Sequence, residues 1–407
     1  MTEHLTIGER VAWYRRRRGM SQEVLAGLVD KSTDWVQKAE NNRLELDRLS
    51  VIRSVAHALD VSIGDLIGEP TLVDWCADSR ARTVPALRTA LMDYSQLSPL
   101  LAGQDADHGG PPSTTQLARR VDQVFDAYQQ SRFGYVTAQV PALLHDAMTA
   151  ARHADQDVRG EYHEQLALSY QAAASVLTKL GESDLAWIAA DRGLAAAEQA
   201  GNQIVLGSLF RSVAHTLLAT GRFEAARHVV ERGASVLSQD LRHADARMLS
   251  VYGTLFLTGA IAASRAEDRG TTRSYLQEAQ ETADRLGSDS NHIWTAFGPT
   301  NVAIHRVNTA IELGDVQVAL DVGPELDTSA LPTERRVRHA LDVARAYSAR
   351  ARRDDALAVV LEAEQMAPEQ VRHHFISRQL VLTWMRQQRR KPSQGLAGLA
   401  SRLRLTQ

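Results

Sequence analysis

The sequence predicts an all-α fold, with a five-helix head followed by an α-solenoid of helical hairpins. Apolar residues recur at helical spacing, and β-branched and aromatic residues rarely alternate with polar ones, as half-buried strands require. Only 11 of the 407 residues are proline, which interrupts helices. Glycine-marked turns recur in the second half, each followed by an alanine. A chain of this length is expected to hold several domains, and we place them at 1–70, 71–116 and 117–407.

The head is expected to contain five short helices between residues 5 and 67. Ser21, Ser32 and Ser62 stand where three of these helices begin, because a serine side chain accepts a hydrogen bond from a free N–H of the first turn. The first helix is expected over residues 7–18, and the fourth begins near residue 47. Each is short and is stabilised by packing against the others.

The second and third of these helices carry the most information. Val24, Leu25 and Leu28 are expected to form the apolar face of the second helix, and Val36 and Ala39 that of the third. Two short helices that cross steeply form a helix-turn-helix unit, which can present its second helix to the major groove of DNA. The pattern therefore predicts a DNA-binding head.

Five segments of the head occur in a characteristic order. They are Ile7-Gly8-Glu9-Arg10-Val11, Gly19-Met20-Ser21-Gln22-Glu23, Leu25-Ala26, Ser32 with Glu40, and Ala56-His57-Ala58-Leu59-Asp60-Val61. Together they resemble the lambda-repressor-like family of helix-turn-helix regulators, also called the xenobiotic-response-element family. The resemblance covers about the first 70 residues. One position departs from the family: Asn42 stands where glycine is usual, and asparagine tolerates the left-handed conformation of a helix C-cap.

The resemblance implies roles for individual residues. Base edges would be contacted from the start of the third helix, where Lys38 can donate to guanine, Gln37 can pair with adenine, and Asp34 accepts only from cytosine. Arg15 and Glu40 match the family's buried ion pair, a structural role. The implied base contacts are Thr33, Asp34, Gln37 and Lys38, and the implied backbone contacts are Gln22, Asn41, Arg43, Arg16 and Arg17.

The charge of the head is close to balanced. Residues 1–70 hold ten Lys and Arg against eleven Asp and Glu, and the whole chain has a formal net charge of −3. The basic run 15–18 is either a solvated helix end or a patch that attracts phosphates. We therefore expect modest nonspecific affinity for DNA and a specificity that depends on dimerisation.

The second half contains a loose repeat. Gly181 precedes Ala186, Gly221 precedes Ala226, and Gly314 precedes Ala319, each by five residues. The segments around these pairs resemble a degenerate tetratricopeptide array over residues 117–390. Stacked hairpins of this kind form a superhelix with a concave inner face. A loop is expected at 103–115, before the array.

Polar residues lie at helical spacing on two of the predicted inner helices. Asn301, His305 and Asn308 follow the start of a helix at Pro299. Ser208, Ser212 and His215 occupy the same places one repeat class earlier, and Arg211 lies next to them. In the tetratricopeptide family such positions line the groove. They predict an effector groove; the alternative is that they form hydrogen bonds between repeats or lie on solvated helix faces.

Several functional classes have no support in the sequence. We find no phosphate-binding glycine loop, no nucleophile elbow and no metal-ligand spacing, so no catalytic residue, cofactor or metal is expected. The single cysteine, Cys76, cannot form an internal disulfide. No apolar run approaches the ~20 residues of a membrane span. We expect a cytoplasmic protein that is not an enzyme and has no membrane partner.

These observations predict a transcription regulator that binds a partly palindromic double-stranded operator as a homodimer. A peptide or small molecule in the repeat groove would change the spacing of the two heads. The plan resembles the peptide-pheromone-sensing regulators of Gram-positive bacteria. The alternative is an interaction adaptor, localised to DNA by its head, whose repeats dock a partner protein. An enclosed pocket near Asn301 and His305 would favour the effector over the adaptor.

Overall fold

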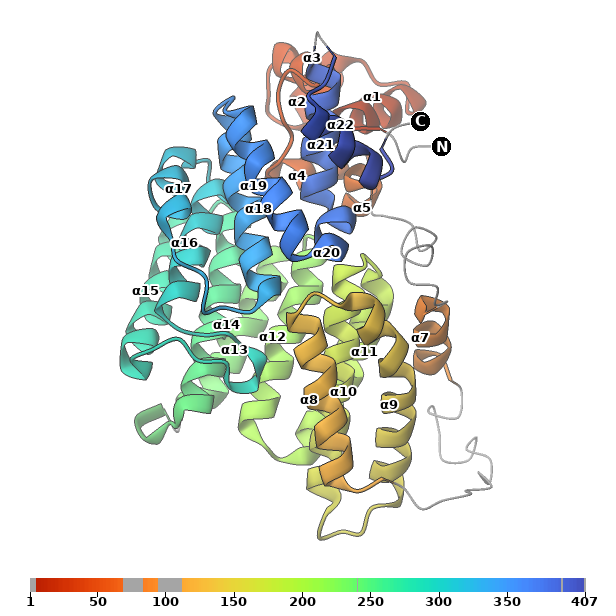
Figure 1. Ribbon diagram of the computed structural model, residues 1–407, viewed down its shortest axis with the longest axis vertical. Helices are drawn as coiled ribbons and strands as arrows, with labels where there is room; N and C mark the ends of the chain where they lie inside the picture. Colours follow the sequence, from red (N-terminus) through yellow and green to blue (C-terminus); the bar gives the residue numbers. More distant parts are fainter. Residues whose placement is uncertain (1–4, 69–82, 94–111, 240, 389–390, 406–407) are drawn as a thin grey trace.

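The computed structural model describes residues 5–68, 83–93, 112–239, 241–388 and 391–405, and it is built from helices (Figure 1). Across these ranges there is no strand, and one isolated bridge joins Ser290 to Phe297. The all-α prediction is confirmed. The loop predicted at 103–115 lies almost wholly outside the described residues.

The head has the five predicted helices. Ser21, Ser32 and Ser62 each accept a hydrogen bond from a first-turn backbone N–H, so all three predicted caps are confirmed. Asn42 follows α3 with a φ of 56°, the left-handed conformation expected of it. The helices are α1 (Ile7–Arg17), α2 (Gln22–Leu28), α3 (Thr33–Glu40), α4 (Leu49–Ala58) and α5 (Ile63–Ile67).

One detail of the predicted head core is wrong. Leu25 of α2 is buried, but Val24 and Leu28 are 51% and 58% exposed. Residues four apart share one helix face, so Val24 and Leu28 point together away from the core. The core face of α2 is formed by Leu25 and Ala26, with Val29 just beyond the helix.

Helix α7 (Thr83–Leu91) packs against α9 and α11, and the helices of the second half start with α8 at Thr114. The helices that follow are α8 (Thr114–Gln129), α9 (Phe133–His153), α10 (Arg159–Lys179), α11 (Ser183–Ala200), α12 (Gln203–Ala219), α13 (Phe223–Ser238), α14 (Ala246–Arg265), α15 (Arg269–Leu286), α16 (Pro299–Glu312), α17 (Val316–Val322), α18 (Thr333–Ala349), α19 (Arg353–Met366), α20 (Pro368–His373), α21 (Phe375–Gln387) and α22 (Gln394–Arg402), with short 3₁₀ helices η2 (Leu241–His243), η3 (His292–Trp294) and η4 (Gly323–Glu325).

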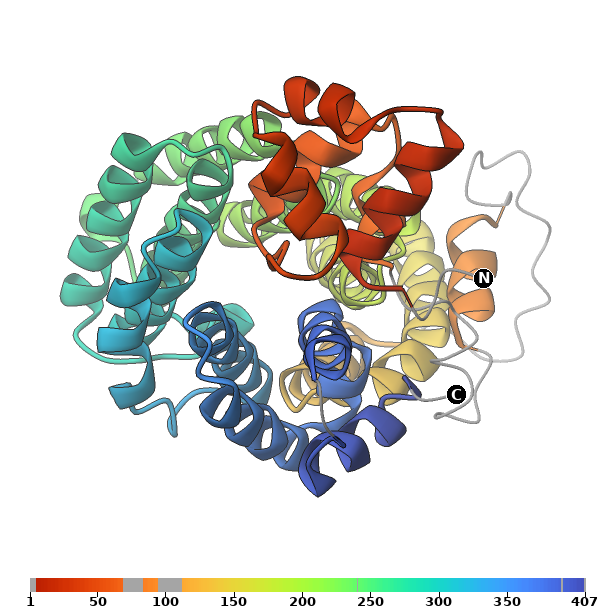
Figure 2. The same cartoon turned by 90° about the horizontal axis from the view of Figure 1, so that it is seen from above.

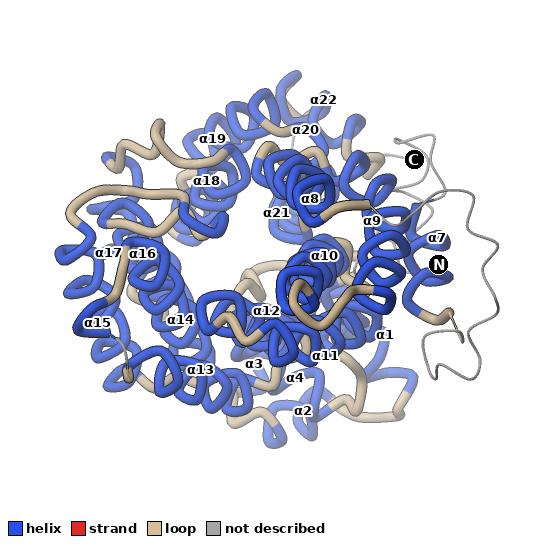
Figure 3. The backbone as a smooth tube through the Cα atoms, turned by 90° about the horizontal axis from the view of Figure 1, so that it is seen from below, coloured by secondary structure: helices blue, strands red, loops and turns tan. Residues whose placement is uncertain are grey.

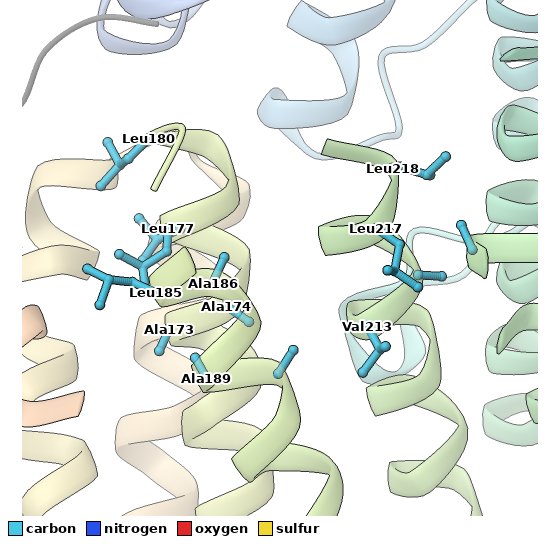
Figure 4. Packing of buried hydrophobic residues seen from close by; sticks show 14 of the residues in the cluster. Ala173, Ala174, Leu177, Leu180, Leu185, Ala186, Ala189, Val213, Leu217 and Leu218 are labelled. Atoms are coloured by element: carbon cyan, nitrogen blue, oxygen red, sulfur yellow. The ribbon is translucent and has the colours of Figure 1, made fainter. Parts of the chain in front are cut away.

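Small residues let the hairpin helices approach closely. Gly181, Gly221 and Gly314 turn the chain with φ values of 76°, 74° and 85°, in the left-handed region that favours glycine. The alanine five residues after each of them is fully buried. Figure 4 shows this packing for α10 and α11, where the buried alanines Ala173, Ala174, Ala186 and Ala189 lie beside Leu177 and Leu185. The predicted α-solenoid of helical hairpins is confirmed.

The solenoid closes on itself, which the sequence did not predict. Seen from above and below, α18–α22 return beside α8 and α9 (Figures 2 and 3). Phe125 of α8 stacks on Trp294 with ring centroids 4.1 Å apart. Ser131 donates to the Gln370 side chain at 2.6 Å. The inner face is therefore the wall of a ring.

The head sits on one rim of this ring (Figure 2). Its hydrophobic core is continuous with that of the repeats, from Ile7 in α1 to Leu255 in α14. Within the described residues, α14 is the one helix long and apolar enough to cross a membrane, and 72% of that stretch is buried inside the protein. Its apolar side chains therefore have a place in the repeat core.

Candidate nucleic-acid interface and central cavity

The outer face of α3 is open to solvent. Ser32 caps the N-terminus of this helix, and Val36 and Ala39 are buried on its inner face. The side chains on the opposite face of the helix therefore point toward solvent. The four residues expected to contact bases are all exposed: Thr33, Asp34, Gln37 and Lys38. Lys38 Nζ forms an ion pair with Asp34 at 2.7 Å. The exposed helix surface therefore carries both donors and acceptors, the chemistry that base edges require.

The residues expected at the DNA backbone surround α3. Gln22 donates to the Glu40 carboxylate at 2.7 Å, and Asn41 donates to the Gln37 carbonyl at 2.7 Å. Both side chains are thus held in place by α3 itself. Arg16, Arg17 and Arg43 are exposed, and the Arg17 guanidinium lies 5.1 Å from the Trp13 ring centre.

A buried ion pair fixes α1 against α3. Arg15 donates through Nε and Nη2 to the two Glu40 oxygens at 2.5 and 2.9 Å, and through Nη1 to the Met20 carbonyl at 2.7 Å. The hydrogen bond to Glu40 raises the pKa of Arg15. The pair has the structural geometry that its match to the family implies.

Polar contacts join the head to the rim of the ring. Arg48 donates to the Glu267 carboxylate at 2.8 Å and to the Glu312 carbonyl at 2.9 Å. The backbone N–H of Leu49 donates to the Glu312 carboxylate at 3.3 Å, and Ser50 donates to Glu267 at 3.2 Å. The start of α4 is thus bound to the turns of the repeats.

A buried arginine lies at the centre of this interface. Arg345 of α18, only 3% exposed, donates to the Asp47 carbonyl at 2.7 Å and lies 3.4 Å from oxygens of both Glu312 and Asp342. Although burial opposes its charge, Glu312, Asp47 and Asp342 raise the pKa of Arg345. We call Arg345 with these three carboxylates the latch.

The ring surrounds a central cavity of about 300 Å³ that is partly open to solvent. Its wall includes Leu49 and Ile67 of the head as well as residues of α8, α10, α12, α16, α18, α20 and α21. A molecule inside it would touch both the head and the repeats. This size is at the lower end of the roughly 300–1,000 Å³ of small-molecule sites.

The cavity brings together four of the six residues expected in the effector groove. Arg211, His215, His305 and Asn308 line it. Burial lowers the pKa of His305 to about 3 and lowers that of His215 well below its usual value, so both rings are neutral. Asn308 donates to Asp342 at 2.8 Å, a hydrogen bond between two repeats.

The other two expected residues lie behind the wall. Ser208 is fully buried and accepts a hydrogen bond from Gln171 at 2.7 Å, so it joins α10 to α12. Asn301 is also fully buried, and its carbonyl lies 2.8 Å from His305 Nδ1. Its side-chain amide has no hydrogen-bond partner among the described residues. Neither residue is part of the cavity surface.

Sequence reasoning missed several charged residues of the cavity. They come from α10 and α18, and the closure of the ring brings these helices together. Lys179 forms an ion pair with Glu334, and Arg338 lies 3.5 Å from Asp342. Although burial favours the neutral acid, Lys179 and Arg335 lower the pKa of Glu334 to about 2. No group of three His, Cys, Asp or Glu among the described residues could hold a metal ion.

Comparison with known proteins matches the head alone to a family. Residues 6–67 match the family described as "Helix-turn-helix domain". No curated protein sequence matches the chain significantly.

Two solved structures are similar to the chain over much of its length. PlcR of Bacillus thuringiensis, solved with the peptide PapR7 and DNA, is 13% identical with a TM-score of 0.35, and the match covers 89% of this chain and 98% of PlcR. ComR of S. thermophilus, solved with DNA and its signalling peptide ComS, is 13% identical with a TM-score of 0.26, over 75% of this chain and 99% of ComR. On the family match, residues 6–67 of this chain form a helix-turn-helix domain.

Proposed function

We propose that the protein is a sequence-specific transcription regulator that binds a partly palindromic operator as a homodimer. The exposed α3 residues would contact base edges, while Arg16, Arg17 and Arg43 would lie against phosphates. In a dimer the two heads would occupy half-sites about 34 Å apart. The repeats, at residues 117–407, would supply both the dimer contact and the sensor, joined to the head (1–70) by residues 71–116. Such a regulator acts in the cytoplasm.

The observation that carries the sensing function is the shared wall of the cavity. Leu49 begins α4 and Ile67 ends α5, and both line the same cavity as His305 and Arg335 of the repeats. An effector bound there would contact the head directly. A ligand shifts an equilibrium only when it binds two states differently. A ligand that touches both the head and the repeats would do so if the two parts changed position relative to each other.

The latch offers a second route from the cavity to the head. Asn308 and Asp342 line the cavity, and Asp342 contacts Arg345, which bonds to the carbonyl of Asp47 just before α4. An effector that draws Asn308 or Arg338 away from Asp342 would change the charges around Arg345. The orientation of α4, and with it that of α3, would then depend on the cavity.

The adaptor function remains the alternative. An adaptor would bind its partner on an accessible surface of the repeats, whereas the polar residues of the inner face surround a cavity partly covered by the head. The position of these residues in a cavity, with the head on part of its wall, favours an effector of small size over a docked protein.

The proposal is tested by selecting the sequences that the protein binds from random DNA. The binding of the most enriched sequence is then measured by salt titration and by sedimentation. We expect a two-fold symmetric sequence with one-turn spacing, bound by two copies of the protein. Equal, steeply salt-dependent binding to all sequences would contradict it and favour the adaptor.

A further inference from the structure

The wall of the central cavity is strongly basic. Lys179, Arg211, Arg265, Arg335 and Arg338 line it, against two carboxylates, those of Glu334 and Asp342. This excess of positive charge occurs in a chain whose formal net charge is −3. Charges confined in a cavity of low dielectric interact far more strongly than charges in water. The cavity therefore has a large electrostatic preference for anions.

Three of these cations form ion pairs within the described residues and two do not. Lys179 pairs with Glu334, Arg338 with Asp342, and Arg265 lies 3.8 Å from Glu312. Among the described residues, no carboxylate forms an ion pair with either Arg211 or Arg335. The Nε atoms of both are buried without a hydrogen-bond partner. Both side chains are otherwise half-buried. A guanidinium without an ion-pair partner in the wall of a cavity is stabilised when an anion binds beside it.

Arg211 and Arg335 come from different helices of the ring and line the same cavity. Arg211 lies on α12 and Arg335 on α18, and both contribute to the cavity wall. Burial and the nearby positive charge of Arg335 lower the pKa of Arg211 to about 10. The neutral ring of His215 lines the same wall and can donate one N–H group. The single N–H of neutral His305 is held by the Asn301 carbonyl, so this ring offers the cavity no donor.

The rest of the cavity offers apolar surface. The stacked rings of Phe125 and Trp294 contribute to it, together with Ile261, Ile304 and Phe375. Small-molecule sites commonly combine such apolar walls with a few converging polar groups. The cavity thus has a charged part for one anionic group and an apolar part for an attached ring or chain.

We propose that the cavity binds a small ligand with one carboxylate or phosphate group on an apolar body, and that Arg211 and Arg335 hold the anionic group. Arginine suits this role because its planar fork can donate two parallel hydrogen bonds to either oxyanion. The role of this ligand as the effector rests on the proposed function. The binding of the ligand to the cavity is independent of that function.

Ligand-observed NMR titrations of the full-length protein, without DNA, test the proposal. The probes are phenyl phosphate, benzoate and, as a neutral match in size, benzamide. We expect at least one of the two anions to bind at least about tenfold more tightly than benzamide. Arg211→Gln and Arg335→Gln should each weaken the binding of that anion at least about tenfold, because each removes a charge-assisted hydrogen bond. Neither should change the binding of benzamide.

Two further variants control for folding and for nonspecific charge. Arg336→Gln removes an arginine of the same helix that does not line the cavity, and should leave every affinity unchanged. Arg335→Lys keeps the charge and should keep the preference for an anion. The preferred anion distinguishes a phosphate ligand from a carboxylate ligand.

Equal binding of benzamide and both anions would overturn the proposal, as would anion affinities that survive Arg211→Gln and Arg335→Gln. Failure of the proposed function has a different signature. In that case the anion binds through the two arginines, but saturating amounts of it leave the DNA affinity unchanged.

Discussion

Replacement of Arg345 by methionine should weaken the contact between head and repeats more than any exposed ion pair could. Arg345 is 3% exposed, and Glu312 and Asp342 beside it are 1% exposed. Methionine keeps much of the side-chain volume, but it removes the positive charge that pairs with these carboxylates. Removal of one partner from a buried ion pair typically costs about 3–5 kcal/mol.

The size of the expected effect follows from the length of the chain. Unfolding entropies of roughly 2.1 cal/mol/K per residue convert this cost into a fall of about 4–6 °C in the melting temperature of 407 residues. Hydrogen exchange should locate the damage at the start of α4, where the N–H of Leu49 is bonded to Glu312.

Two variants control this experiment. Arg352→Met removes an exposed arginine paired with Asp355 at 2.7 Å and should cost less than about 1 kcal/mol. Addition of Glu312→Gln to Arg345→Met removes one of the uncompensated charges and should recover part of the lost stability. If Arg345→Met lowers the melting temperature no more than Arg352→Met does, the latch contributes nothing and the reasoning is refuted.

Three other predictions concern the head and the cavity. Lys38→Ala should reduce discrimination between operator and scrambled DNA by about 1–3 kcal/mol in equilibrium binding, and an equal loss on both sequences would rule out a base contact. Leu25→Ala should destabilise the protein by about 2–5 kcal/mol, whereas Leu28→Ala on the exposed face of α2 should change stability by less than about 0.5 kcal/mol, and similar losses in thermal denaturation would contradict the assigned burial. Burial and the charge of Arg335 lower the pKa of His305 in the folded protein to about 3. As the pH falls below 6.5, the unfolded chain therefore binds a proton at His305 that the folded protein does not bind. The free energy of unfolding then falls on acidification, by at most about 1.4 kcal/mol per pH unit. His305→Asn should flatten the fall in melting temperature between pH 6.5 and about 5, and an unchanged slope would show that this ring does not stay neutral.

Local features of the fold were predictable from the sequence because they depend on neighbouring residues. The serine caps, the left-handed Asn42 and the turn glycines each follow from one side chain and its own backbone. The exposure of Val24 and Leu28 was not predictable in this way. An apolar residue on a seven-residue helix can face either side, and only the packing of α3 and α4 around α2 decides between them.

The candidate cavity shows the same limit at a larger scale. Arg211, His215, His305 and Asn308 stood out because they are polar residues at or beside positions that line the groove in tetratricopeptide repeats. Arg335 and Lys179 gave no such signal, since basic residues are ordinary at helix ends on a solvated surface. They became neighbours because α18 returns beside α8 and α10 when the ring closes. Contacts such as Ser131 with Gln370 and Gly134 with Glu369 join the two ends of the ring.

The central claim is that the DNA affinity of the head depends on its contact with the repeats. The most direct test is the operator affinity of the Arg345→Met/Glu312→Gln variant against that of the unchanged protein, measured by fluorescence anisotropy at one salt concentration. Coupling between two sites of a regulator is typically worth about 1–3 kcal/mol. The account therefore predicts a change of at least about fivefold. Identical affinities, in a variant whose head is shown by hydrogen exchange to be released from the repeats, would contradict it.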